Sequence, residues 1–322
     1  MGDPSRIPDA AWKELLVAAQ TAAGDSHGPP QKMPEEKRKF IESAMSDLVQ
    51  KTDPVRQMKK LIDDLRQTEE PKKHEDTERL KAVVDSLEDI VCQVDAAVDF
   101  CKLGGLGEIL RLMNCKCDEA RCEVMRLIPT LAQHNPKVQD IMLDQEVIAA
   151  LLSLIVSTEE SSDVRVKALS GVSSVVRAHE GTYNLLYLKY FLSRFRQLNG
   201  FVVLMDAFKF AHHSGDEKVA NKTAIVFANL AHDLGYQGAL DHGLPSCIIR
   251  MYGDLAPSSD AASYLREYIE DNVSLKSIDS ENKKIIEKAL HEQLEYKKEH
   301  NADDPVWNLV IDSLHANCYF YQ

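Results

Sequence analysis

Residues 162–179, SDVRVKALSGVSSVVRAH, form one of three long segments that align with one another without gaps. The other two are DEARCEVMRLIPTLAQH from Asp118 and EKVANKTAIVFANLAHD from Glu217. In each segment apolar residues recur every three to four positions, which is typical of a helix with one buried face. The alignment places Thr130, Ser174 and Asn229 at one common position. These three segments therefore predict a repeated helical unit.

A shorter apolar helix is expected before each long one, and four such segments open on a small turn. They are GGLGEILRLM from Gly104, QEVIAALLSLI from Gln145, NGFVVLMDAF from Asn199 and HGLPSCIIRMY from His242. Leu106 and Val147 lie 41 residues apart, and Phe201 and Leu244 lie 43 apart. The middle interval is 54 residues because it contains the aromatic insert 183–196, YNLLYLKYFLSRFR.

A period of about 42 residues with two or three helices is the signature of armadillo and HEAT arrays. One unit cannot bury its apolar faces alone, whereas stacked units share a continuous core. We therefore predict an all-α fold, an armadillo-like repeat superhelix whose long helices line a concave groove. Glycines such as Gly104 are expected to let the chain turn between units.

The regions flanking the repeats also favour helix. Further long helices are expected from Thr77 and from about Ala261 to Val273, and shorter ones from Asp9 to Ala23, from Pro34 and from Asp53-Pro54. The charged stretch from Glu69 to Glu78 suggests a loop. The linker GDSHGPP has little apolar surface to bury. We expect a flexible N-terminal segment, 1–32, and a repeat domain, 33–322, with capping helices at both ends.

The composition narrows the class of protein. The chain has 322 residues, 44% of them hydrophobic, and a formal net charge of −13. There is no basic stripe of the kind that nucleic-acid binders carry, and no run of about 18 apolar residues that could span a bilayer. The N-terminus MGDPSRIPDA lacks the apolar core of a signal peptide. We expect a cytoplasmic monomer that binds neither nucleic acid nor membrane, with the nucleus open as a second location.

Signatures of catalysis and metal binding are missing from the sequence. Gly104, Gly105 and Gly107 are followed by no Lys-Ser/Thr, so a turn between repeats is favoured over a phosphate-binding loop. GxSxG, HExxH and paired CxxC motifs are absent. Cys115, Cys117 and Cys122 cluster ahead of His134, but their spacing does not fit a zinc site. We expect structural thiols, no metal, no cofactor and no enzymatic activity.

Three stretches together resemble one family. The helix SDVRVKALSGVSSVVRAH, the turn VDAAVDFCKLGGL at 94–106 and the N-terminal MPEEKRKFIESAM are similar to the Fes-one/Hsp-binding-protein-one class. Members of that class are armadillo-type nucleotide exchange factors for the seventy-kilodalton heat-shock chaperones. The resemblance runs from about Trp12 to the C-terminal helices. The aromatic insert and the tail CYFYQ depart from it, which leaves the shape of the groove at the third repeat open.

The resemblance implies a co-chaperone. The groove would grip the chaperone's nucleotide-binding domain in an orientation incompatible with closure around ADP, so that nucleotide and co-chaperone weaken each other's binding. The N-terminal segment would imitate an extended apolar client and occupy the chaperone's peptide groove. Leu15 and Leu16 match the paired leucines of that release segment, with Trp12 beside them. A loosely docked amphipathic helix is the alternative interpretation of these three residues.

We expect six residues to contact the partner: Ala97, Arg126, Arg165, Ser170, Lys222 and Asn229. Five of them lie on the long helices, and Arg126 is a charge on an otherwise apolar helix that must reach water or a carboxylate. For these five, a solvated or intramolecularly paired side chain is the alternative. Ala97 is small enough to allow close approach of the partner, or of a neighbouring helix if it serves packing.

A generic armadillo scaffold that binds an extended peptide is the rival interpretation. Such grooves carry ladders of Trp and Asn on the inner face of the long helix. The Trp-type positions here are Arg126, Ser170 and Ile225, and the Asn-type positions are Thr130, Ser174 and Asn229. Only Asn229 matches, so the residues favour the co-chaperone.

Overall fold

The structure is a computed structural model that describes residues 35–69, 74–176, 193–273 and 279–300. Within these ranges all regular secondary structure is helical, which confirms the all-α prediction. The chain divides into two compact units, Met1–Gln67 and Thr68–Gln322. The expected helix from Asp9 and the expected boundary at residues 32–33 lie outside the described residues. No described helix is long and apolar enough to cross a membrane.

The first unit contains α2 (Glu35–Thr52) and α3 (Pro54–Gln67). The Asp53 carboxylate accepts a hydrogen bond from the N–H of Val55 at 3.0 Å, and Pro54 occupies the first helical position, where its missing N–H costs nothing. Met58, Ile62 and Leu65 are spaced by four and three residues and are buried. The helix expected after Asp53 is thus confirmed.

The second unit begins with α4 (His74–Val91), so the prediction of a loop through Glu78 was wrong. Glu75 and Asp76 lie in the first turn of α4, where the positive end of the helix dipole stabilises acidic side chains. The charge run that suggested a loop is therefore partly a helix start.

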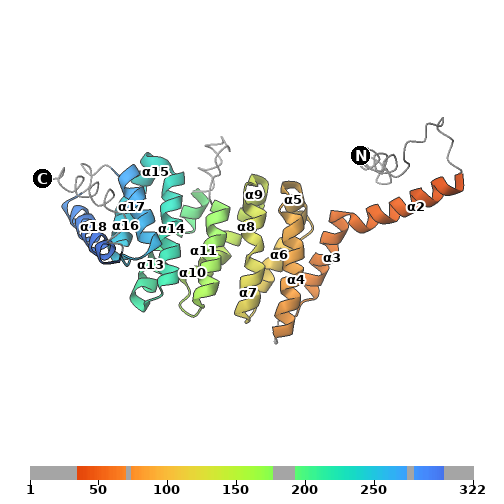
Figure 1. The fold of residues 1–322 in the computed structure, drawn as a ribbon, viewed down its shortest axis with the longest axis horizontal. Coiled ribbons are helices and arrows are strands. Elements are labelled where there is room, and N and C mark those ends of the chain that lie inside the picture. Colours follow the sequence, from red (N-terminus) through yellow and green to blue (C-terminus); the bar gives the residue numbers. More distant parts are fainter. Residues whose placement is uncertain (1–34, 70–73, 177–192, 274–278, 301–322) are drawn as a thin grey trace. The chain divides into compact units, whose positions relative to one another are not determined.

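The helices of the second unit form three rows (Figure 1), and three of the four repeats contribute a described helix to every row; for the repeat of α13 and α14, part of the chain lies outside the described residues. The first row comprises α5 (Val94–Lys102), α9 (Pro136–Asp144) and α15 (Gly235–Asp241). The second row comprises α6 (Gly105–Met113), α10 (Val147–Val156), α13 (Gly200–Ser214) and α16 (Leu244–Asp254). The long row comprises α4, α7 (Asp118–Met125) with α8 (Leu127–Ala132), α11 (Ser162–Val176), α14 (Glu217–Asp233) and α17 (Asp260–Asn272). The final helix, α18 (Ser280–His300), packs on α16.

Two details of the repeat differ from expectation. Residues 94–102 form the helix α5 and not a turn, because Ala97, Val98, Phe100 and Cys101 supply a buried face. The long helix expected from Asp118 is interrupted at Arg126, between α7 and α8. Pro129 has no N–H to donate to the carbonyl of Met125, which breaks the helical hydrogen-bond ladder at this point.

The turns before the second helices share a left-handed backbone. Gly104, Glu146, Asn199 and Gly243 have φ values of 86°, 59°, 54° and 67°. Two of these turns use glycine as predicted, whereas Glu146 is a residue type that adopts this conformation at a cost. The same geometry therefore recurs in all four turns even where the residue does not favour it.

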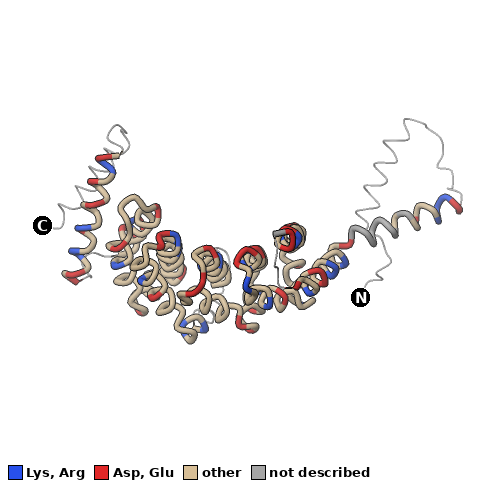
Figure 2. The backbone as a smooth tube through the Cα atoms, turned by 90° about the horizontal axis from the view of Figure 1, so that it is seen from below, with Lys and Arg blue, Asp and Glu red and all other residues tan. Residues whose placement is uncertain are grey.

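Successive long helices pack against each other, α4 on α7, α7 on α11, α11 on α14 and α14 on α17. Within the second unit the repeats follow a curve, and the long helices lie on its inner side (Figures 1 and 2). We call the exposed side of these five helices the ladder face. Its position is that of the concave groove predicted from the repeats.

Candidate partner-binding face

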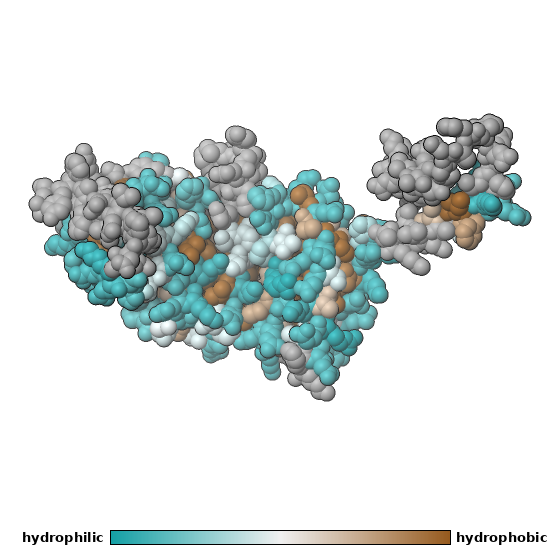
Figure 3. Space-filling view, viewed as in Figure 1, coloured by the Kyte–Doolittle hydropathy of each residue, from teal (hydrophilic) through white to brown (hydrophobic). Residues whose placement is uncertain are grey.

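The ladder face carries four of the six predicted contact residues. Arg126, Ser170, Lys222 and Asn229 are each partly exposed and lie on three successive rungs, at the α7–α8 junction and on α11 and α14. The gap-free alignment of the long segments explains this placement, since equivalent positions on stacked helices point to the same side. Figure 3, viewed as in Figure 1, shows that the face toward the viewer is mostly hydrophilic with small apolar patches.

Arg126 is fully engaged within the chain. Its guanidinium lies 2.6 Å from carboxylate oxygens of both Glu88 and Glu123 and 3.0 Å from Asp85. Burial opposes the charge, but hydrogen bonds and attraction from these three carboxylates raise the pKa of Arg126 above its ordinary value. Asp85 and Glu88 come from α4, so this cluster joins α4 to α7. The alternative of intramolecular pairing thus describes Arg126.

Lys222 differs from Arg126 in the charges that surround it. Among the residues that the structure describes, no carboxylate lies within ion-pair distance of Lys222 or of Lys167, the ladder-face lysine on α11. Burial lowers the pKa of Lys222, and repulsion from Lys167 lowers it further. Lys167 on α11 and Lys222 on α14 are thus close enough to repel each other, and neither has an acidic partner in the described part of a chain whose net charge is −13.

Polar residues of the ladder face near the lysines already make hydrogen bonds within the chain. Ser170 and Ser174 donate their hydroxyls to the carbonyls of Val166 and Ser170, one turn earlier in α11. The side-chain oxygen of Asn229 accepts a 2.7 Å hydrogen bond from the Tyr264 hydroxyl on α17. The one Asn that matches a peptide-clamping ladder is thus already bonded to the next rung.

Ala97 and Arg165 are buried, at 1% and 2% exposure. Ala97 lies on the buried face of α5, in agreement with its packing alternative. Arg165 donates its Nε–H to the carbonyl of Ile155 at 3.1 Å, and its guanidinium lies 5.2 Å from the centre of the Phe210 ring. Burial lowers the pKa of Arg165, and the nearby Asp216 carboxylate offsets part of this effect. In this structure neither side chain is available to a partner without rearrangement.

The remaining expectations concern the N-terminal segment, the thiols and metal binding. Trp12, Leu15 and Leu16 lie outside the described residues, so their role stays a prediction. The described cysteines are free thiols, and burial raises the pKa of Cys122, with a contribution from Asp163, to about 11. In the described parts of the chain, no group of three His, Cys, Asp or Glu side chains could hold a metal ion.

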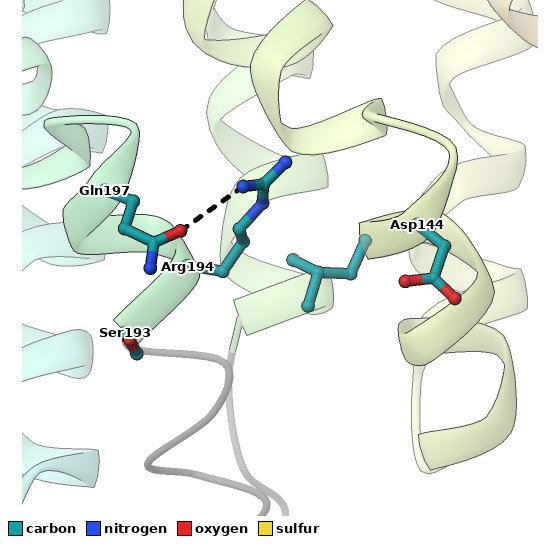
Figure 4. A pocket seen from close by; sticks show the side chains of 5 residues that line it. Asp144, Ser193, Arg194 and Gln197 are labelled. Atoms are coloured by element: carbon teal, nitrogen blue, oxygen red, sulfur yellow. Dashed lines mark hydrogen bonds between the residues drawn. The ribbon is translucent and has the colours of Figure 1, made fainter.

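A small polar pocket lies away from the ladder face, between the end of α9 and the residues that precede α13 (Figure 4). Its volume is about 240 Å³, and Leu143, Asp144, Ser193, Arg194 and Gln197 line it. Arg194 donates a 3.2 Å hydrogen bond to Gln197. The pocket contains none of the predicted site residues, and its open, mixed-charge lining does not define a ligand.

The sequence contained a signal for Lys167 that our contact prediction did not use. Lys167 and Lys222 are separated by 55 residues, as are Ser174 and Asn229, so the repeat alignment places the two lysines on neighbouring rungs. The partners of Arg126 on α4 had no comparable signal, because Asp85 and Glu88 lie in a helix outside the gap-free alignment.

These features define an armadillo-type helical repeat protein with a charged inner face. The fold is similar to that of a designed armadillo repeat protein in complex with a (KR)4 peptide, with a TM-score of 0.51 and 14% sequence identity. That match covers 80% of this chain and 98% of the designed chain. It confirms the armadillo-like architecture.

Sequence comparison then shows which known proteins this chain is similar to. Residues 96–229 match the model of the SIL1/FES1/HPBP1 C-terminal domain. The chain is also 29% identical over 236 residues to Hsp70-binding protein 1 of Rattus norvegicus, covering 71% of this chain and 62% of the relative. For Hsp70-binding protein 1 of Homo sapiens the identity is 29% over 233 residues, covering 70% and 61%. These matches agree with the family resemblance found in the sequence, and the chain spans less than two thirds of the length of these relatives.

Proposed function

We propose that this chain is a co-chaperone that binds the nucleotide-binding domain of the seventy-kilodalton heat-shock chaperone, Hsp70, through its ladder face and promotes release of ADP. The family and the printed name of its relatives, Hsp70-binding protein 1, support a chaperone partner. The site is supported by the Lys167–Lys222 pair, two partly buried cations that have no carboxylate partner among the described residues. Such a pair suits an acidic patch on the partner, which would neutralise both charges.

The proposed mechanism is linkage and not catalysis. If the ladder face binds a form of the nucleotide-binding domain that cannot close around ADP, each ligand lowers the affinity of the other by the same factor. The chain then needs no reactive group or cofactor of its own, and we propose that it is not an enzyme. A cytoplasmic location, with the nucleus as a second possibility, belongs to the same proposal.

Release of a fluorescent ADP analogue from purified Hsp70 tests this function. Adding the full-length chain should accelerate release in a dose-dependent way, and Lys222→Glu should weaken that effect. Replacing Lys283, an exposed lysine on α18, by Glu makes the same charge change away from the ladder face and should leave release unaffected. If the chain binds Hsp70 but release stays at its basal rate, the exchange activity is wrong and only a binding role remains.

The N-terminal segment would add client release to this activity. We propose that Trp12, Leu15 and Leu16 occupy the chaperone's peptide groove and hinder rebinding of a client. Deleting residues 1–32 should leave ADP release nearly unchanged and slow the liberation of a bound fluorescent client peptide. Leu15→Ser with Leu16→Ser should reproduce this loss. A markedly lower melting temperature of the truncated protein would instead place the segment in the fold.

A further inference from the structure

The first turns of α11 and α14 are joined by a set of polar contacts centred on Asp216. The Ser162 hydroxyl on α11 donates a 2.7 Å hydrogen bond to one carboxylate oxygen of Asp216, and Arg165 Nη1 lies 3.8 Å from the same oxygen. The other oxygen accepts the N–H of Val219 at 3.2 Å, which makes Asp216 the N-cap of α14. We call Ser162, Arg165 and Asp216 the Asp216 junction.

The equivalent arginine of the preceding repeat, Arg121, pairs with more carboxylates than Arg165 does. Arg121 occupies the register of Arg165 and likewise bonds the end of the short helix before it, through Nε to the carbonyl of Met113 at 2.9 Å. Its Nη1 also pairs with two carboxylates, Asp118 of its own helix and Glu160 of the next repeat. At the later junction the position of Asp118 is taken by Ser162, which carries no charge.

Asp216 is therefore the single acid of its junction. In the described part of the chain, Nη2 of the buried Arg165 has no hydrogen-bond partner. The ion pair between Asp163 and Lys218 also crosses from α11 to α14, at 3.5 Å, but both side chains are about three-quarters exposed. Exposed ion pairs of this kind contribute little to the free energy of folding. Among the described residues, the part-buried polar contacts between the two helix starts thus all involve one carboxylate, that of Asp216.

The two ladder-face lysines lie just beyond this junction. Lys167 follows Ser162 by five residues, and Lys222 follows Asp216 by six. Their like charges repel, which favours separation of the two helix starts. Contacts that hold α11 and α14 together in the first turn therefore oppose this separation.

We propose that Asp216 is a positioning residue, which ties the starts of α11 and α14 together and so holds Lys167 and Lys222 side by side as one cationic site. This inference rests on the proposed function for its biological meaning, because the site is meant for an acidic patch on Hsp70. A preformed pair binds better than two lysines that must first be brought together against their repulsion, since that cost is met in folding and not in binding.

The first experiment is independent of any partner. The pKa of Lys222 is measured by NMR in the full-length protein with ¹³C-dimethylated lysines, in wild type and in Asp216→Ala, Ser162→Ala and Ser153→Ala. The first two variants should raise the Lys222 pKa by about half a unit or more as the lysines separate and become hydrated. Deleting a nearby negative charge alone would lower a lysine pKa, so a rise in Asp216→Ala cannot come from the charge change.

The controls separate positioning from general loss of stability. The Ser153 hydroxyl on α10 donates to the carbonyl of Ala150 in its own helix, so Ser153→Ala repeats the chemical change of Ser162→Ala without touching the junction. Ser162→Ala removes no charge and leaves the N-cap of α14 in place, which provides a folded variant if Asp216→Ala unfolds. An unchanged Lys222 pKa in a folded junction variant overturns the proposal.

The second experiment measures affinity for the Hsp70 nucleotide-binding domain. Asp216→Ala should weaken binding about fivefold or more in the wild-type background and less than twofold when both lysines are already glutamine. Equal losses in the two backgrounds would show a general structural effect and contradict positioning. If the wild-type chain does not bind Hsp70 at all, the proposed function fails, while the NMR result still decides whether the junction holds the lysines together.

Discussion

Two adjacent parts of the ladder face treat a positive charge in opposite ways. At the α4–α7 contact Arg126 is surrounded by Asp85, Glu88 and Glu123 within 3.0 Å. At the α11–α14 contact Lys167 and Lys222 lie near each other, and no described carboxylate pairs with either. The first arrangement resolves its charges inside the chain and serves stability. The second leaves two cations without a carboxylate partner among the described residues, which destabilises the free protein and, under the proposed function, favours binding to an acidic patch.

The comparison teaches that exposure and charge alone do not identify a contact residue. Arg126 and Lys222 are both cationic and partly exposed on the same face, and both were predicted to meet the partner. Only the internal partners of each side chain separate them, because a cation already paired gains little from a second acid.

Reversing both unpaired lysines should abolish tight binding. We expect Lys167→Glu with Lys222→Glu to weaken association with the Hsp70 nucleotide-binding domain about 100-fold, or about 2.7 kcal/mol, because an acidic patch would then face two acids. Isothermal titration calorimetry measures the change. The matched control is Lys283→Glu with Lys284→Glu on α18, which alters net charge equally at exposed positions. Comparable losses in both pairs would remove the special role of the ladder lysines.

Removing Arg126 should cost stability. Arg126→Ala leaves Asp85, Glu88 and Glu123 close together without their cation, and we expect the free energy of unfolding in urea to fall by about 1–2 kcal/mol. Arg196→Ala, at an exposed arginine with no ion pair among the described residues, serves as control. Binding of the folded Arg126→Gln variant should change less than threefold. A much larger loss of affinity with intact stability would show that Arg126 also contacts the partner.

Removing the charge of Lys222 should not lower the free energy of unfolding, in contrast to removing Arg126. Lys222→Met keeps the aliphatic stem and deletes a cation whose charge is opposed by burial and by Lys167, so we expect unfolding free energy to stay the same or rise by up to about 1 kcal/mol. The folded pKa of Lys222 lies below the ordinary value of 10.5. The free-energy cost of its buried charge is therefore present at neutral pH and disappears as the pH rises from the folded pKa to 10.5. Urea unfolding at pH 7 and pH 10.5 checks both points, and destabilisation at pH 7 would contradict them.

The salt dependence of association with Hsp70 should come from Lys167 and Lys222 and not from Arg126. Raising NaCl from about 0.05 to 0.5 M should slow association of the wild-type chain with Hsp70 severalfold, because screening weakens attraction between separated charges. Lys167→Gln with Lys222→Gln should flatten this dependence, whereas Arg126→Gln should keep it. Stopped-flow association rates give the comparison. Identical salt slopes in all three proteins would mean that charges elsewhere dominate encounter.

The sequence by itself determined the helical repeat and the register of the ladder. Apolar spacing and a period of about 42 residues were sufficient, because helix periodicity and the need to bury an apolar face are local properties. The alignment through Thr130, Ser174 and Asn229 was also enough to place four predicted contacts on one face. Local charge was less reliable, since Glu75 and Asp76 belong to the first turn of α4 and not to a loop.

Only the tertiary structure decided which charged side chains are paired within the fold. Arg165 is buried because the carbonyl of Ile155 and the carboxylate of Asp216 reach it from other elements, and Arg126 is neutralised by α4. Likewise Glu146 adopts a left-handed backbone because the geometry of the repeat demands it, against its own preference. Whether a charge is available depends on residues far along the chain that packing brings within a few ångströms, and no local pattern encodes that distance.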